Sequence, residues 1–76
     1  MISLTMGMDF EASGYENIRI RGTLMGFSPD EIQSITQDVI DFADLGEYIN
    51  MPMRTYSSGM SMRLAFALAT SGAALS

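Results

Sequence analysis

The stretch SPDEIQSITQDVIDFADLG, residues 28–46, carries the clearest structural signal of the chain. Ser28 and Glu31 have the S-x-x-E spacing of a capping box, and Pro29 suits the first position of a helix. Apolar side chains then recur at steps of three or four, namely Ile32, Ile35, Val39 and Phe42. The stretch therefore predicts an amphipathic helix, which Gly46 is expected to close.

A second capping box stands upstream of this helix. Ser13 and Glu16 have the same spacing, which predicts a helix that starts at residue 13 and ends near Gly26. Before it, apolar residues alternate with Ser3 and Thr5, and this alternation is typical of a short strand that leads into a loop. We therefore expect a mostly α-helical chain with about three helices and a short N-terminal strand.

The segment after Gly46 predicts a less regular connection and a third helix. We expect a helical turn at residues 47–50, an extended link around Pro52 and a polar loop at residues 55–59. The following helix, Met60 to Ala69, is apolar on every side except at Ser61 and Arg63, and such a helix is expected to be enclosed. The eight Met residues of the chain fit core filling or an adaptable partner surface.

Length and composition exclude several classes of protein. Seventy-six residues make one small domain at most, and the absence of Cys and His removes the usual zinc, haem and Ser-His-Asp chemistries. Four Arg against nine acidic residues give a net charge of −5, which argues against nucleic acid as a partner. Because the chain has no Lys, it contains no P-loop pattern G-x-x-x-x-G-K-[ST].

The acidic residues of the main helix do not form a convincing metal site. Asp38, Asp41 and Asp44 recur at three-residue steps but lack the loop pattern of a cation site. A solvated helix face is the better interpretation, and no metal is assigned. The chain also lacks an apolar run of about 20 residues that would span a bilayer.

Ser57, Ser58 and Gly59 are the candidates for chemistry. They precede the apolar helix, and a helix N-terminus offers free N–H groups and a positive dipole end to an anion such as phosphate. The alternative is local: Ser57 or Ser58 caps the helix and Gly59 eases the turn. Spacing alone favours the cap.

The run YSSGMSMRLAFALAT, residues 56–70, resembles the signature motif and following helix of an ABC transporter ATPase. More narrowly, Y-S-S-G-M followed by R-L-A-F-A is similar to the form found in ATP-binding subunits of polysaccharide and lipopolysaccharide O-antigen exporters. Upstream segments occur in the order of that subfamily, and the likeness covers roughly Leu4 to Thr70. These segments are residues 7–9, 11–18, 26–28, 40–46 and 54–55.

The resemblance implies that residues 1–76 are part of an ABC ATPase domain. Residues 1–12 would lead in, residues 13–55 would form the helical subdomain, residues 56–70 would hold the signature motif and its helix, and residues 71–76 would be a divergent tail. In such ATPases this loop closes on ATP held, with magnesium, by the P-loop of a second, identical subunit. Ser57, Ser58, Gly59 and Met60 would contact that ATP, and Arg63 would support the helix.

The same resemblance implies a transmembrane permease as partner and a cytoplasmic position at the inner face of the membrane. Some departures limit the assignment. Ser58 and Met60 replace a Gly and the Gln of the general motif, no Gln near Ser3 provides a Q-loop residue, and Walker B and the switch His are missing. We therefore expect this chain alone to be inactive and assign no catalytic residue. The competing hypothesis is a small helical interaction module without nucleotide chemistry.

Overall fold

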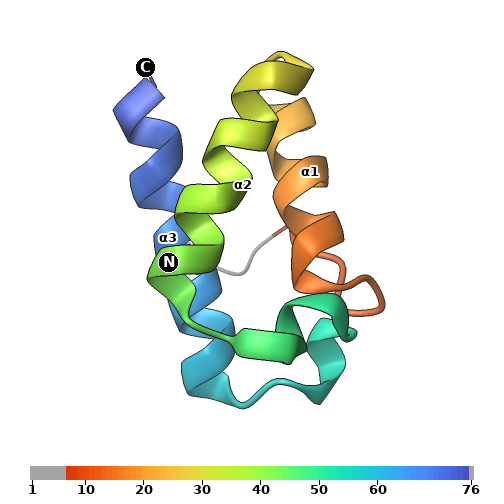
Figure 1. The fold of residues 1–76 in the computed structure, drawn as a ribbon. Helices are drawn as coiled ribbons and strands as arrows, with labels where there is room; N and C mark the ends of the chain where they lie inside the picture. The colour runs from red at the N-terminus through yellow and green to blue at the C-terminus, as the bar shows by residue number, and fades with distance from the viewer. Residues whose placement is uncertain (1–6, 76) are drawn as a thin grey trace, which may run out of the picture.

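The computed structural model describes residues 7–75, which fold into three α-helices and two short 3-10 helices. The α-helices are α1 (Gly14–Leu24), α2 (Pro29–Ala43) and α3 (Ser58–Leu75), and the 3-10 helices are η1 (Gly46–Asn50) and η2 (Met53–Thr55). Helix α2 packs against both α1 and α3, with η1 and η2 at one end of the bundle (Figure 1). The prediction of a mostly α-helical chain with three helices is confirmed.

The predicted N-terminal strand falls mainly on residues 1–6, which lie outside the described residues. Residues 7–12 form turns and irregular backbone. In the described part of the chain, strand-like pairing is limited to an isolated antiparallel bridge between Ser13 and Pro52.

Both predicted capping boxes are present. The Ser13 hydroxyl accepts from the Glu16 N–H at 3.0 Å, and the Glu16 carboxylate accepts from the Ser13 N–H at 3.1 Å. Ser28 and Glu31 make the same pair of bonds at 3.2 and 2.8 Å, with Pro29 at the first helical position. The starts of α1 and α2 are therefore fixed by local hydrogen bonds, as predicted.

The helix ends agree with the sequence less well. Gly26 follows α1 with φ +86°, as expected of a glycine after a helix. Helix α2, however, ends at Ala43, and Asp44 takes the left-handed conformation with φ +51°. Gly46 was therefore the wrong residue for this helix end, because Asp also tolerates that region. Gly46 instead begins η1, which supplies the helical turn expected at residues 47–50.

Helix α3 is longer than the predicted Met60–Ala69. It begins at Ser58, so the expected polar loop shrinks, and η2 takes up Met53–Thr55. It continues to Leu75, because no proline interrupts the chain there and alanine favours helix. Residues 70–75 are thus helical in the structure.

The core lies where the three helices and η2 meet. Ile18, Val39, Met53 and Leu64 are fully buried there. Helix α3 contributes one face to this core, while Met62 and Phe66 on its other side stay 48% and 53% exposed. The expectation that this helix is enclosed on every side is therefore not met within the described chain. The methionines divide likewise, with Met53 buried and Met62 exposed.

The loop before α1 is attached to η2. The Met53 N–H donates to the Ala12 carbonyl at 3.0 Å, and the Arg54 N–H donates to the Phe10 carbonyl at 2.9 Å. Asn17, which is 2% exposed, accepts from the Asp9 N–H at 2.8 Å and donates to three backbone carbonyls. These bonds place residues 9–13 next to the segment that leads to Ser57.

Candidate functional site

Ser57, Ser58 and Gly59 lie together and exposed at the N-terminus of α3. The Ser57 hydroxyl accepts from the Met60 N–H at 3.2 Å, and the Ser57 carbonyl accepts from the Ser61 N–H at 3.0 Å. Ser57 is thus the N-cap of α3, as the local alternative required. A cap and an anion contact are compatible, because the Ser57 hydroxyl still has its own hydrogen to donate.

The loop has the chemistry of an anion site. The N–H groups of the first turn have no carbonyl within the helix to bond, and those of Ser58 and Gly59 belong to this set. The aligned peptide dipoles of α3 add partial positive charge at the same end. A phosphate group therefore fits the residues present, with two hydroxyls and an unhindered backbone at Gly59, where an added Cβ would meet nothing closer than the Ser57 hydroxyl oxygen at 3.9 Å.

Met60 and Arg63 occupy different surroundings from the loop. Met60 is half-buried and packs against the core, so its side chain is directed away from the exposed loop. Arg63 is exposed, and among residues 7–75 its side chain forms no ion pair or hydrogen bond. The roles assigned to both residues remain predictions.

A shallow hollow of about 280 Å³ lies beside the loop. It is lined by Phe10, Tyr56, Ser58, Ser61 and Met62. Two residues before Tyr56, Arg54 pairs with Glu11 at 3.4 Å, an ion pair in which both side chains are largely exposed. Such a pair contributes little to stability in water, so it is not expected to restrain the loop.

Tyr56 lies directly before the loop and is held by another segment. Its hydroxyl donates to the Tyr48 carbonyl at 2.5 Å, and the two tyrosine rings meet edge to face at 6.3 Å. Burial raises the pKa of the Tyr56 hydroxyl above its ordinary value, and a backbone hydrogen bond with Gly14 acts in the opposite direction. The sequence motif alone gave no sign of these partners.

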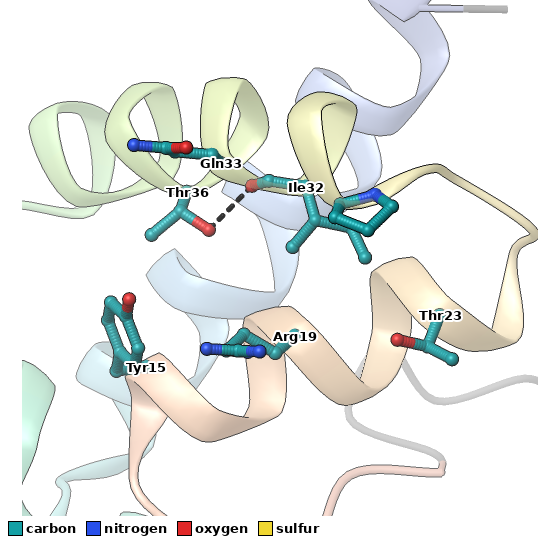
Figure 2. A pocket seen from close by; sticks show the side chains of 7 residues that line it. Tyr15, Arg19, Thr23, Ile32, Gln33 and Thr36 are labelled. Atoms are coloured by element: carbon teal, nitrogen blue, oxygen red, sulfur yellow. Dashed lines mark hydrogen bonds between the residues drawn. The ribbon is translucent and has the colours of Figure 1, made fainter.

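A second cavity, of about 360 Å³, lies between α1 and α2. Figure 2 shows Tyr15, Arg19 and Thr23 of α1 opposite Ile32, Gln33 and Thr36 of α2, with the Thr36 hydroxyl donating to the Ile32 carbonyl at 2.6 Å. In the described part of the chain, Arg19 has no charged partner. The sequence did not indicate this cavity, because only the packing of the two helices brings the side chains of α2 opposite those of α1.

The acidic residues of α2 are spread along its surface. Asp38, Asp41 and Asp44 are exposed, and the Gln37 amide donates to the Asp41 carboxylate at 3.0 Å. Searching residues 7–75 for a helix with the length and hydrophobicity to cross a membrane yields none.

Comparison with known proteins gives clear relatives, although no family model matches the chain. It is 43% identical over 68 residues to the teichoic acids export ATP-binding protein TagH of Bacillus cereus. It is 47% identical over 70 residues to the O-antigen export system ATP-binding protein RfbB of Myxococcus xanthus, and 48% identical over 71 residues to the O-antigen export system ATP-binding protein RfbE of Yersinia enterocolitica.

These similarities cover most of this chain but a minor part of each relative. They span 90%, 92% and 93% of the chain, and 12%, 16% and 30% of the respective relatives. The exporter resemblance drawn from the signature-like run is thereby confirmed at the level of homology. The chain is a homologue of part of the ATP-binding proteins named for the export of teichoic acids and O-antigen.

Proposed function

We propose that this chain is the signature-bearing helical segment of an ABC transporter ATPase whose parent protein couples ATP binding and hydrolysis to export of a cell-surface polymer. The names of the relatives indicate teichoic acid or O-antigen as the polymer class. The observation that carries the proposal is the exposed Ser57-Ser58-Gly59 loop at the N-terminus of the 18-residue helix α3. This loop offers hydrogen-bond donors to a phosphate group supplied by another subunit.

Each loop residue has a defined role in this proposal. The Ser57 hydroxyl donates to the γ-phosphate of ATP held by a second, identical subunit, while the Ser58 and Gly59 N–H groups complete the donor set. Met60 anchors the loop by packing its side chain against the core. We assign none of the magnesium ligands of the parent enzyme, and no catalytic residue, to this chain.

The cavity between α1 and α2 is the proposed contact for the transmembrane permease. Arg19 supplies a cation there in a chain whose net charge is −5, and Ile20 and Leu24 of α1 are exposed beside it at 39% and 74%. A partner segment with apolar side chains and a carboxylate would complement this surface. The proposal places the chain at the cytoplasmic side of the membrane, next to that permease.

A chimaera provides the test. The segment of RfbE from Yersinia enterocolitica that matches this chain is replaced by the chain itself, and ATP hydrolysis and O-antigen export are measured. Gly59→Asp is then introduced. A carboxylate in the first turn favours the helix but repels phosphate, so loss of activity cannot be attributed to loss of the helix. We expect ATP hydrolysis to fall by about tenfold or more, as for the removal of about 1.4 kcal/mol of stabilisation.

Gly59→Asn is the matched control, because it has the same shape without the charge. We expect it to keep most of the activity of the unmodified chimaera. Ser34→Ala, at an exposed position of α2, checks that surface substitutions are tolerated. Equal hydrolysis by the Gly59→Asp and Gly59→Asn chimaeras would contradict the proposed phosphate contact.

An exposed aromatic pair supports a second candidate function, a free-standing helical interaction module. Phe42 and Phe66 are 57% and 53% exposed, and their rings stack at 5.9 Å between α2 and α3. Aromatic surface of this kind is typical of protein contacts. This alternative predicts a defined oligomer of the isolated chain in solution, which is lost with Phe66→Ser.

A further inference from the structure

Tyr56 connects the exposed loop to two other parts of the molecule. Its hydroxyl donates to the carbonyl of Tyr48 in η1 at 2.5 Å, and its N–H donates to the carbonyl of Met53 in η2 at 2.9 Å. The next residue, Ser57, is the N-cap of α3. The backbone that enters the loop is thus attached on both the side-chain and the main-chain sides of Tyr56.

Gly14 provides the third contact. This buried glycine is the first residue of α1, and a Cβ at its position would lie 2.6 Å from the Tyr56 hydroxyl oxygen. The same Cβ would lie 3.1 Å from Cδ1 of Ile49 and 3.3 Å from Cδ2 of Leu64. The hydroxyl therefore lies in a tight space beside Gly14, which is open only because residue 14 has no side chain.

We propose that the Tyr56 hydroxyl is a positioning group, which holds Ser57, Ser58 and Gly59 in the orientation that receives the phosphate of ATP. This inference rests on the proposed function for its ligand. Tyr56 thereby contacts the start of α1 through Gly14 and η1 through Tyr48, and it directly precedes the N-cap of α3. A shift of any of these elements would therefore reach the loop through this one residue. The ring alone does not explain the arrangement, because Phe would keep the edge-to-face contact with Tyr48 and lose only the hydroxyl.

Amide hydrogen exchange in the 76-residue chain tests the positioning without reference to ATP. Tyr56→Phe is compared with Tyr48→Phe, a matched control because Tyr56 bonds to the backbone carbonyl of Tyr48 and not to its hydroxyl. We expect Tyr56→Phe to speed exchange of the Met60 and Ser61 N–H groups by about threefold to tenfold, the range for loss of one neutral hydrogen bond. Exchange of the Ile32 N–H, which bonds to Ser28 at 2.9 Å, should not change.

Two results would overturn the inference in this experiment. One is unchanged exchange at both Met60 and Ser61 in Tyr56→Phe. The other is an equal increase at Ile32, which would mean that the hydroxyl stabilises the whole fold and has no particular effect on the loop.

Kinetics in the RfbE chimaera give a readout that remains decisive if the isolated chain is poorly folded. We expect Tyr56→Phe to raise the KM for ATP about threefold to tenfold and to change kcat less than twofold, with Tyr48→Phe unchanged. An unchanged KM in a chimaera that is sensitive to Gly59→Asp would reject the role of Tyr56 while the proposed function stands. Insensitivity to Gly59→Asp would reject the proposed function, and amide exchange would still decide whether Tyr56 positions the loop.

Substitution of Gly14 offers an independent cross-check. Gly14→Ala should disturb Met60 exchange as Tyr56→Phe does, because the new methyl group displaces the hydroxyl. The double variant should be less disturbed than the sum of the two, since removing the hydroxyl makes room for the methyl group. Strict additivity would contradict the contact between these residues.

Discussion

Asn17 shows how much of the loop before α1 depends on one buried side chain. Its amide bonds the Asp9 N–H and three carbonyls, those of Asp9, Ala12 and Ser13. Asn17→Ala would leave the Asp9 N–H without its partner and remove one of the hydrogen bonds of each carbonyl, so we expect the free energy of unfolding to fall by about 2–3 kcal/mol. Urea denaturation followed by circular dichroism measures this, with the exposed Asn50→Ala as control. Equal losses for the two variants would contradict the assigned role.

Tyr56 makes stability depend on alkaline pH. Its pKa in the folded chain is above the ordinary value of about 10 because burial disfavours the phenolate. At pH values well below 10 the hydroxyl is protonated in both states and contributes no pH dependence. As the pH rises further, the unfolded chain loses this proton first, so the free energy of unfolding falls. Denaturation at pH 8 and 10.5 should show a smaller fall for Tyr56→Phe than for Tyr48→Phe, and equal falls would refute the shift.

Individual residues were predictable from the sequence where their partners are close in the chain. The capping roles of Ser13 and Ser28 follow from the S-x-x-E spacing, and the bonds span three residues. The sequence left Ser57 open between a cap and a phosphate contact, and the structure shows the cap. The contacts of the Tyr56 hydroxyl could not be predicted, because Tyr48 and Gly14 come close to it only in the folded chain.

At the scale of elements, Gly22 sets how closely α1 approaches α2. A Cβ at Gly22 would lie 2.7 Å from Cγ1 of Ile32, so Gly22→Ala should force the helices apart. We expect a loss of about 1–2 kcal/mol in the free energy of unfolding, in spite of the better helix propensity of alanine.

Gly59→Ala is the control with the opposite sign. Its Cβ would meet only the Ser57 hydroxyl oxygen, at 3.9 Å, so alanine should raise the free energy of unfolding by about 0.5 kcal/mol. Thermal denaturation of both variants compares them. A stabilised Gly22→Ala chain would mean that α1 and α2 are not in close contact at this position.

The helices themselves were predictable because caps and apolar periodicity are local signals, whereas two of their ends were not. Asp44 ends α2 in the left-handed region, which Asp tolerates, although the sequence favours the nearby Gly46 for such a position. Helix α3 runs past Ala69 because Ser71 and Gly72 weaken a helix without breaking it. The exposure of Phe66 was not predicted, because an apolar sequence pattern does not show how much of the helix surface the rest of the chain covers.

At the scale of the whole molecule, we expect the 76-residue chain to hydrolyse no ATP above background. It contains no Lys and therefore no P-loop, and in our proposal the signature loop acts on ATP held by another subunit. Release of phosphate at millimolar ATP measures this, with the active chimaera as positive control. Turnover by the isolated chain that Gly59→Asp abolishes would contradict the expectation.

The hydrogen bonds between residues 9–13 and residues 52–54 also fix an order of assembly. They join parts of the chain that are about 40 positions apart, while α1 and α2 meet through the short connection at residues 25–28. Closing a long loop costs entropy that near neighbours do not have to overcome, so the α1–α2 pair should form first. During synthesis on the ribosome, the segment before Ser57 would therefore take its shape only after residue 54 has emerged and returned to the start of α1.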